Sequence, residues 1–389
     1  MSVSVADVTP LLSSLIRIDS VTPWLIPGGA GEMGVVRFVA EWLKNELPDV
    51  GVVIEEIEPG RPNLIIRWKG TGGGRRLCLN AHTDTVGYAA WPDSALVPRV
   101  EGDIMHGLGA GDDKGHCVAA LLALREVVRS GRRLRGDLMV ALVADEEGAT
   151  IGTQHLVDHH KDEIDAAFVL EANPINNVLV THQGFGWIDV IVHGKAAHGS
   201  QPEKGVDSIV HMAEVVRRLH ALDRDKFSPH PHPMNGRTVF HTGTITGGTD
   251  YATYPDRCVL GIEIGSQPGE TLQNRVREIE EIFRDLAAED PSFRGEVSVK
   301  IDRNPFEAKG HEELWQSLTR AMTAVVGSGP KPVGDNAWMD AALMQEAAIP
   351  TLVAGASGSG FHSPDEWVSL TELALLANVL AETALTYCA

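Results

Sequence analysis

The sequence LCLNAHTD at residues 77–84 indicates the fold class, because an apolar run ends there in two polar side chains, His82 and Asp84. Short β-rich runs of this kind alternate with helical patterns along the first part of the chain, which is typical of an α/β fold with a mostly parallel central sheet. His82 is therefore predicted at the carboxyl end of a strand, where open α/β sheets place their functional sites. The predicted strands are Leu77–Thr83, Asp137–Ala144 and Ala166–Ala172.

A long apolar stretch, Lys114–Val128, follows the first strand. It exceeds the length of a typical strand, and it begins beside Asp112 and Asp113, where the positive end of a helix dipole favours acidic side chains. We therefore expect a helix that packs on the sheet.

From about residue 184 to residue 304 the pattern changes to strand, helix, strand, strand, helix, strand, which is the signature of a ferredoxin-like α+β module. The two helices, Val206–Leu222 and Glu270–Glu289, carry apolar side chains every three or four residues, so each should bury one face. These positions are Ile209, Met212, Val216 and Leu219 in the first helix and Leu272, Val276, Ile279, Phe283 and Leu286 in the second.

The α/β pattern returns after residue 305. Ser369 and Glu372 have the spacing of a capping box, which predicts that the last helix begins after Ser369. The sequence therefore predicts an α/β domain over residues 1–183 and 305–389, interrupted by an inserted domain over residues 184–304.

The composition excludes several classes of protein. Hydrophobic residues make up 43% and charged residues 22%, which is ordinary for a folded globular chain. The formal charge is 33 − 53 = −20, so the field of the protein repels nucleic acid and anionic membranes. We recognise no signal peptide and no membrane span, and the cysteines lie too far apart for a cysteine zinc site, so we expect a cytoplasmic protein. The cysteines are Cys78, Cys117, Cys258 and Cys388.

Carboxylates follow the other predicted strands. Glu146 and Glu147 come after the second strand, and Glu171 closes the apolar run of the third. Taken alone, each is compatible with a solvated acidic turn. Adjacent carboxylates are costly unless a cation neutralises one of them. A second interpretation therefore makes Glu147 a metal ligand and leaves Glu146 free to take a proton from a metal-bound water.

A glycine-rich loop, GLGAGDDKG at residues 107–115, leads into the predicted helix. Such loops can cradle phosphate at a helix N-terminus, but the two adjacent carboxylates would repel it. Asp112 could instead bridge two cations or simply cap the helix, and the loop alone does not decide between these roles. A second glycine-rich stretch, residues 354–360, precedes His362.

Five of these side chains supply two imidazole nitrogens and three carboxylates at the edges of one sheet. This donor set suits a pair of zinc-like divalent ions with one bridging carboxylate, and cobalt and manganese accept the same ligands. Asp84 would hold the far nitrogen of the first histidine and fix its tautomer. The predicted metal ligands are His82, Asp112, Glu147, Glu171 and His362.

This ordered set resembles the dinuclear zinc peptidase and deacylase family, which includes acetylornithine deacetylase, succinyl-diaminopimelate desuccinylase, aminoacylase and glutamate carboxypeptidase. The resemblance covers nearly the whole chain, including the inserted domain. Its motifs are His82-Thr-Asp84, Gly107-Leu-Gly-Ala-Gly-Asp112, Asp145-Glu146-Glu147-Gly148, Glu171, Gly194-Lys-Ala-Ala-His198 and His362.

The resemblance implies a role for each predicted ligand. His82 and Glu171 would be the terminal ligands of one metal ion, and Glu147 and His362 those of the other. Asp112 would bridge the two ions.

The resemblance also implies the reaction and the assembly. Glu146 would be the general acid and base in the hydrolysis of an amide bond of a small N-acyl amino acid, peptide or related amide. The inserted domain would form a homodimer, in which His198 of one subunit reaches into the site of the other and stabilises the oxyanion.

Two positions depart from the family pattern. Many relatives hold a substrate carboxylate with an Asn and an Arg, and the corresponding positions here are Ala252 and Gly265. The alternative function is therefore the same chemistry on an atypical C–N bond, such as deamination of an aromatic amine or hydrolysis of a xenobiotic amide. A non-catalytic binding protein is the third hypothesis, although the predicted ligands and Glu146 are all present.

Overall fold

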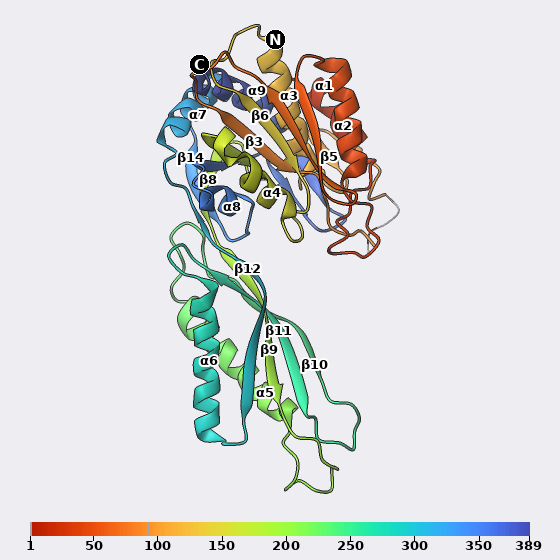
Figure 1. Ribbon diagram of the computed structural model, residues 1–389, viewed down its shortest axis with the longest axis vertical. Helices are drawn as coiled ribbons and strands as arrows, with labels where there is room; N and C mark the ends of the chain where they lie inside the picture. The colour runs from red at the N-terminus through yellow and green to blue at the C-terminus, as the bar shows by residue number, and fades with distance from the viewer. Residues whose placement is uncertain (1, 90, 92–93) are drawn as a thin grey trace. The chain divides into compact units, whose positions relative to one another are not determined.

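The computed structural model describes residues 2–89, 91 and 94–389, and Figure 1 shows the course of the chain. The chain divides into two compact units. Unit 1 consists of Met1–Val180, Ala308–Pro332 and Met339–Ala389, and unit 2 consists of Thr181–Glu307 and Val333–Trp338.

The bounds of unit 2 differ from the expected residues 184–304 at three places: it begins at Thr181, its first part ends at Glu307, and it includes a short later segment. Val333–Trp338 belongs to unit 2, whereas the sequence pattern placed it in the α/β domain. The reason is its backbone: the N–H of Gln183 donates to the carbonyl of Asp335 at 3.2 Å, and Gly334 packs against Met234 and Asn235.

The main sheet of unit 1 is mixed. Its central strands β6, β3, β7 and β15 run parallel, but β2 and β8 pair antiparallel on the two sides of this centre. The expectation of a mostly parallel sheet is therefore wrong, because the outer strands include the hairpin β1–β2, whose short turn can only join antiparallel strands. The order is β1 (Gly51–Glu58), β2 (Arg61–Trp68), β6 (Leu138–Val143), β3 (Leu77–His82), β7 (Ala166–Leu170), β15 (Thr351–Ala354) and β8 (Asn177–His182), and both β13 (Phe306–Glu307) and β14 (Lys331–Asp335) also pair with β8.

Every residue of β3, β6 and β7 is buried, as expected of parallel strands that helices cover on both faces. The predicted helix is present as α3 (Lys114–Arg129), which contacts β3 and β6 as well as α1 and α9. The other helices of unit 1 are α1 (Val5–Ile16), α2 (Met33–Glu46), α4 (Ile151–His160), α7 (Glu312–Val325), α8 (Ala341–Glu346) and α9 (Leu370–Tyr387).

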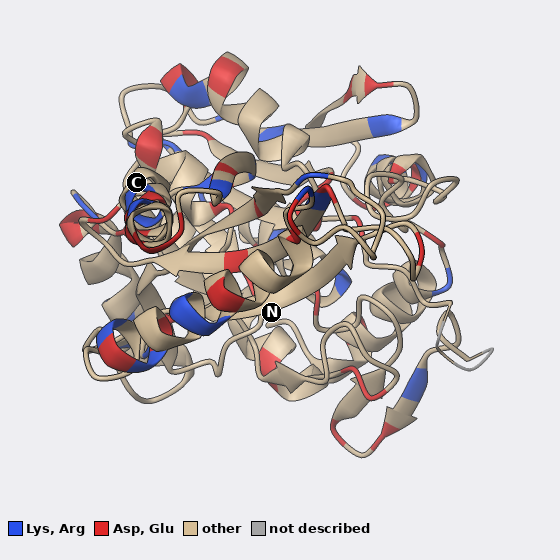
Figure 2. Cartoon of the chain, turned by 90° about the horizontal axis from the view of Figure 1, so that it is seen from below, with Lys and Arg blue, Asp and Glu red and all other residues tan. Residues whose placement is uncertain are grey.

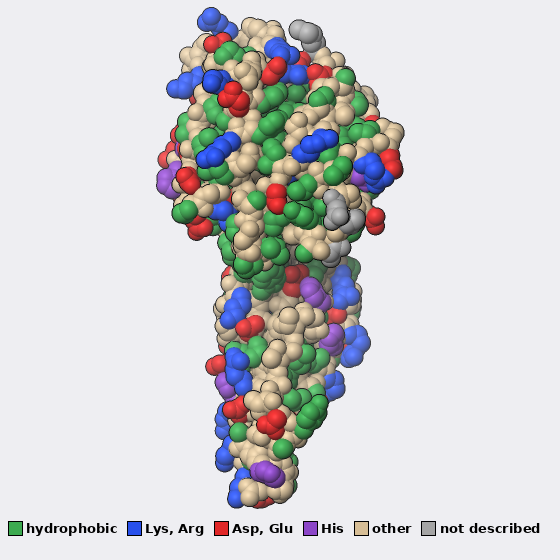
Figure 3. Space-filling model, turned by 90° about the vertical axis from the view of Figure 1, so that its right-hand side faces the viewer, with side chains coloured by type: hydrophobic (Ala, Val, Ile, Leu, Met, Phe, Trp, Pro, Cys, Tyr) green, Lys and Arg blue, Asp and Glu red, His purple; other side chains and the backbone are tan. Residues whose placement is uncertain are grey.

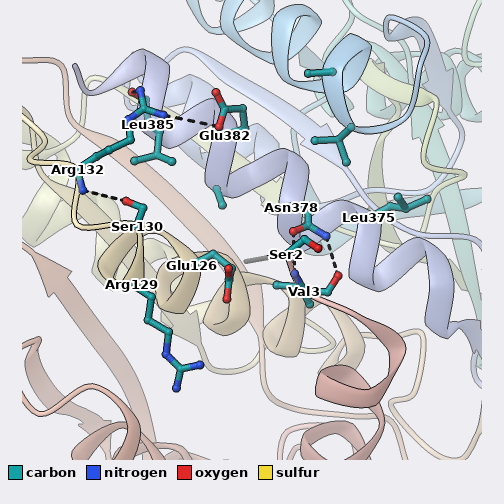
Figure 4. A pocket seen from close by; sticks show the side chains of 13 residues that line it. Ser2, Val3, Glu126, Arg129, Ser130, Arg132, Leu375, Asn378, Glu382 and Leu385 are labelled. Carbon is teal, nitrogen blue, oxygen red and sulfur yellow. Dashed lines mark hydrogen bonds and ion pairs between the residues drawn. The ribbon is translucent and has the colours of Figure 1, made fainter.

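A second, small sheet of unit 1 has the order β16 (Gly358–Ser359), β17 (Trp367–Ser369), β5 (Ile104–His106) and β4 (Arg99–Glu101). The N-terminal segment is tied to α9 by two hydrogen bonds between Val3 and Asn378, both 2.9 Å long (Figure 4). These residues line a cavity of about 660 Å³ together with residues of α3, α7 and α9.

Unit 2 has the predicted order of strand, helix, strand, strand, helix, strand. Its antiparallel sheet has the spatial order β10-β11-β9-β12, which is the ferredoxin-like arrangement. The elements are β9 (Gly184–His193), α5 (Ser208–Leu222), β10 (Phe240–Gly247), β11 (Arg257–Ser266), α6 (Leu272–Glu289) and β12 (Arg294–Arg303).

The buried faces of the two helices of unit 2 follow the sequence pattern with one exception. The five predicted positions of α6 are all buried, as are Met212 and Leu219 of α5. Ile209, however, is 44% exposed, so its prediction is wrong. It lies in the first turn of α5, where its backbone N–H is capped by Asp207, and Val215 fills the core instead.

The capping box predicted for the last helix is only half present. Ser369 Oγ accepts the backbone N–H of Glu372 at 3.1 Å. The Glu372 carboxylate does not return this bond but accepts the N–H groups of Ser357 and Ile175, so it fastens two loops to α9. Within the described part of the chain, we find no helix that combines the length and apolar character needed to cross a membrane.

Candidate metal centre

The parallel strands bring the predicted ligands of unit 1 to one edge of the sheet. His82 is the last residue of β3, Glu171 directly follows β7, and Glu147 lies four residues after the end of β6. Asp112 precedes α3, and His362 lies in the loop between β16 and β17. The carboxyl ends of parallel strands share an edge, so residues far apart in sequence converge there.

Asp112 lies between the two histidines. Its Oδ1 is 3.0 Å from His82 Nε2, and its Oδ2 is 3.2 Å from His362 Nε2. Each oxygen therefore faces a different imidazole, which is the arrangement that a bridging carboxylate requires.

The other two carboxylates each lie beside one histidine. Glu171 Oε1 is 3.8 Å from His82 Nε2, and Glu147 Oε1 is 2.9 Å from His362 Nε2. Among the described residues, three groups of possible ligand atoms lie within 4.8 Å of one another, and two of them contain predicted ligands. One of these two contains Asp112, Glu147 and His362, and the other contains His82, Asp113 and Glu171.

Asp84 joins the histidine at the end of β3 to the turn after β6. Its Oδ1 accepts the N–H of Glu146 and its Oδ2 accepts the N–H of Glu147, both at 3.1 Å. The same carboxylate lies 3.4 Å from His82 Nδ1. Asp84 therefore fixes the backbone of both glutamates relative to His82.

Asp113 is a residue of the site that the sequence interpretation missed. Its Oδ2 accepts the N–H of His82 at 3.0 Å, and its Oδ1 is 2.6 Å from His116 Nδ1. His116 Nε2 in turn accepts the N–H of Ala356 at 3.1 Å. Both oxygens of Asp113 are thus engaged within the protein, so it supports the ligands. The signal in the sequence was its position next to Asp112.

Glu366 was also missed. It is 1% exposed, and its carboxylate accepts the N–H groups of Gly109, Gly111 and Asp112 at 3.1, 2.9 and 3.1 Å. Glu366 follows His362 by four residues, so it ties the loop of one histidine to the loop of the bridging aspartate. Burial and the charge of Asp112 raise its pKa to about 8.

The acids of the centre have strongly shifted pKa values. Burial raises the pKa of Glu147 to about 7, with a further increase from the charge of Asp112. Burial likewise raises the pKa of Glu146 and of Glu171 well above the ordinary range, and in both cases the positive charge of His82 offsets part of the effect. These carboxylates are hard to ionise without a nearby cation.

The pKa values of the two imidazoles are also raised, whereas the pKa of Asp112 is lowered. Hydrogen bonds to Asp112 and Glu147 raise the pKa of His362 to about 11. Burial by itself would lower the pKa of His82, but its contacts with Asp112 and Asp84 raise it well above its ordinary value. Burial disfavours the charged form of Asp112, yet the two histidines hold its pKa below the ordinary range.

The donor set fits divalent ions. Among the described residues, the ion pairs of Asp112, Glu147 and Glu171 are all with histidine, and none is with lysine or arginine. Helices elsewhere in the chain carry both acidic and basic residues (Figure 2). On α5, for example, Glu214 forms an ion pair with Arg217. A buried cluster of carboxylates and imidazoles is the composition that zinc-like ions prefer.

A buried ion-pair network supports the turn that carries the glutamates. Arg61 Nε and Nη2 donate to both oxygens of Glu32 at 2.7 Å, and Nη2 donates to Asp145 Oδ1 at 2.6 Å. Asp145 precedes Glu146 and has a left-handed backbone with φ of 66°, a conformation that costs energy for a residue other than glycine. No local motif marks Arg61 or Glu32, so sequence reasoning could not find them.

His198 and the two departures, Ala252 and Gly265, lie in unit 2. His198 is exposed, and its Nδ1 accepts the N–H of Ser200 at 3.2 Å. A Cβ on Gly265 would lie 2.7 Å from Gln183 Oε1 and 3.2 Å from Val239 N, so a side chain at this position would displace Gln183.

Comparisons with known proteins agree on one family. The sequence model described as Peptidase family M20/M25/M40 matches residues 78–386. Acetylornithine deacetylase from Myxococcus xanthus is 28% identical over 337 residues, which cover 84% of this chain and 84% of that enzyme. The crystal structure of a tripeptidase from Staphylococcus aureus has a TM-score of 0.81 at 19% identity and covers 100% of both chains. A dinuclear metal-binding peptidase from Bacillus subtilis has a TM-score of 0.75 at 15% identity and covers 99% of this chain and 98% of its own.

Proposed function

The chain belongs to Peptidase family M20/M25/M40 and is a metal-dependent enzyme that hydrolyses amide bonds, and we propose that it does so with two divalent ions bridged by Asp112. The observation that carries this proposal is the pair of distances from the two Asp112 oxygens to the two histidines, 3.0 and 3.2 Å. His82 and Glu171 complete the ligands of one ion, and Glu147 and His362 complete those of the other. We propose zinc, with cobalt or manganese as substitutes.

When bound, the two ions would polarise the carbonyl of the amide and increase the acidity of water. Glu146 is the group that moves the proton. Its carboxylate takes a proton from the attacking water and returns it to the leaving nitrogen, so that the products are an acid and an amine. Asp84 accepts the backbone N–H groups of Glu146 and Glu147, both at 3.1 Å, which keeps the base next to the proposed ligand.

The proposed substrate is a small N-acyl amino acid, peptide or related amide. The name of the relative from Myxococcus xanthus, acetylornithine deacetylase, supports a deacylase. The alternative is an atypical C–N bond, as in an aromatic amine. The glycine at position 265, where many relatives carry an arginine that holds a substrate carboxylate, supports this alternative.

We propose that the enzyme is a cytoplasmic homodimer that assembles through unit 2. Strand β10 is an edge strand, and the face of unit 2 seen in Figure 3 includes exposed hydrophobic side chains. Ile245 of β10 and Val210 of α5 are 60% and 63% exposed. Edge strands with apolar side chains are ready-made surfaces for pairing with a second chain. The four cysteines are free, which supports a reducing compartment.

His198 of the partner subunit is the proposed oxyanion donor. Because Ser200 N–H donates to Nδ1 of His198, the neutral ring carries its proton on Nε2. That nitrogen is then the donor that a developing oxyanion would need.

The activity test uses Glu146→Gln. We expect amine release from N-acyl amino acids to fall by about 10²- to 10⁴-fold, the usual contribution of a general base, while the metal content stays that of the wild type. Glu163→Gln changes an exposed glutamate three residues after the end of α4 and should leave the activity unchanged. Retained turnover in Glu146→Gln, or wild-type turnover that survives complete removal of metal, would contradict the proposal.

The test of the shared site mixes two inactive variants. In a heterodimer of His198→Ala and Glu146→Gln, one site has both an intact Glu146 and an intact His198 from its partner. Random exchange of subunits should therefore restore about a quarter of the wild-type activity. Failure to restore any activity, in a mixture shown by mass spectrometry to contain heterodimers, would refute a contribution of His198 from the partner.

A further inference from the structure

The loop before α2 exposes large apolar side chains, although hydrogen bonds fix it to two neighbouring segments of unit 1. Trp24 is 43% exposed and Ile26 is 45% exposed. Single exposed apolar residues are ordinary on protein surfaces. A functional role for these side chains therefore has to be argued from the place where the loop is bound.

One side of the loop is bound to the strand end that carries Asp84. The N–H of Thr22 donates to the carbonyl of Thr85 at 3.0 Å, and the N–H of Thr85 donates to the carbonyl of Ser20 at 3.1 Å. Val21 and Thr85 form a parallel β-bridge. Because Thr85 directly follows Asp84, the loop begins at the edge of the metal centre.

The other side of the loop is bound to the turn that carries Glu146. Thr22 Oγ1 donates to Asp145 Oδ1 at 2.6 Å, and Arg61 Nη2 donates to both Thr22 and Asp145 at 2.9 and 2.6 Å. These groups are buried. The buried network therefore fixes the loop and the turn of the general base to each other.

Two glycines let the apolar side chains approach this turn. A Cβ on Gly148, the residue after Glu147, would lie 3.1 Å from Trp24 Cβ. A Cβ on Gly87 would lie 2.7 Å from Ile26 Cγ1. Trp24 and Ile26 thus border the two strand-end segments that carry the general base and its supporting aspartate.

A third apolar side chain borders the bridging aspartate. Phe361 is 37% exposed and precedes His362. A Cβ on Gly111, next to Asp112, would lie 2.7 Å from Phe361 Cε1. Exposed apolar groups therefore lie next to the segments of three different metal-site residues, and they are all in unit 1.

We propose that residues 22–29 form a specificity loop, in which Trp24 and Ile26 bind an apolar group, aromatic or branched aliphatic, of the amide substrate. The proposal rests on the proposed function, because the group it binds is a part of the amide that reaches Glu146. An apolar group placed against these side chains leaves water, which favours the larger substrate over one that has only a methyl group there. Trp24 and Ile26 act on the choice of substrate and not on the chemical step.

The experiment measures kcat/KM for two series of amides. One series keeps the amine constant and changes the acyl group from acetyl to benzoyl and phenylacetyl, and the other keeps an acetyl group and changes the amine from aliphatic to aromatic. In at least one series, the wild type should prefer the apolar member. Trp24→Ala and Ile26→Ala should each lower kcat/KM for that member by about 10- to 100-fold, and should change kcat/KM for the acetyl or aliphatic member by less than about 3-fold.

Two further variants separate a specific role from a general loss of structure. Val53→Ala removes an apolar side chain of β1 that is similarly exposed, at 46%, and should leave both substrates unchanged. Trp24→Phe keeps an aromatic ring and should retain the preference. Equal changes for both members of a series in Trp24→Ala, or none, would overturn this inference alone, because the wild-type turnover would still support the proposed function. A wild type that releases no amine from any member of either series would overturn both.

Discussion

Arg61→Met is the perturbation that tests most directly how the turn of the general base is supported. The guanidinium lies between Glu32 and Asp145, whose side chains are 0% and 1% exposed. Methionine fills a similar volume but carries no charge. The variant therefore leaves two carboxylates buried without their cation, beside Asp84, which lies in the same cluster.

The magnitude follows from the burial of both partners. Removal of one member of a buried ion pair costs about 3–5 kcal/mol of the free energy of unfolding, because the remaining charge is desolvated and unpaired. Burial already raises the pKa of Glu32 despite its hydrogen bonds to Arg61. The double variant Arg61→Met, Glu32→Gln removes one of the two unpaired charges, so it should be more stable than Arg61→Met by about 1–3 kcal/mol.

The assay is urea denaturation followed by circular dichroism, with hydrogen exchange of β6 to report on the neighbourhood of Asp145. Arg125→Met is the matched control. Arg125 is similarly buried, but its nearer partner Asp7 keeps a side-chain exposure of 30%, and its second partner Glu126 lies farther away at 3.4 Å. The loss should therefore stay below about 2 kcal/mol. A loss of less than about 1 kcal/mol in Arg61→Met, or a double variant less stable than the single one, would refute the reasoning.

Three further predictions concern the metal centre and the core. The apparent affinity for Mn²⁺ should rise with pH between about 6 and 8, by about tenfold per pH unit for each proton released. The reason is that Glu147 and His362 bind metal in their deprotonated forms, whereas their metal-free pKa values are raised to about 7 and about 11. Calorimetry in buffers of different ionisation enthalpy measures the proton release, and a pH-independent affinity would contradict the prediction. Glu366→Gln should weaken metal binding by about 10- to 100-fold, since an amide cannot accept three backbone N–H groups as a carboxylate does; unchanged metal dissociation constants would argue against this support. Phe168→Ala removes a fully buried ring of β7 and should lower the free energy of unfolding by about 3–5 kcal/mol. Denaturation of the metal-free protein measures this loss, and a loss below about 1 kcal/mol would contradict the prediction.

Local patterns predicted those parts of the fold that depend on local interactions. The period of apolar residues in α6 named its five buried apolar positions, because a helix with one apolar stripe has one way to bury it, but it did not predict that Arg275 is buried too. The same reasoning failed at Ile209, where the cap at Asp207 decides which way the first turn faces. Periodicity also could not show that β2 and β8 pair antiparallel, since strand direction depends on how distant segments connect.

The sequence by itself predicted the candidate ligands, because two imidazoles and three carboxylates at the edges of one predicted sheet together form a donor set for divalent ions, although each of them alone is ambiguous. Only the tertiary structure decided what supports them. Arg61 lies 84 residues before Asp145 along the chain, and Glu32 lies 29 residues before Arg61. Glu366 lies 254 residues after Asp112. Hydrogen bonds over such separations leave no periodic trace in the sequence, because they are made by single side chains that the packing of the sheet and its helices brings together.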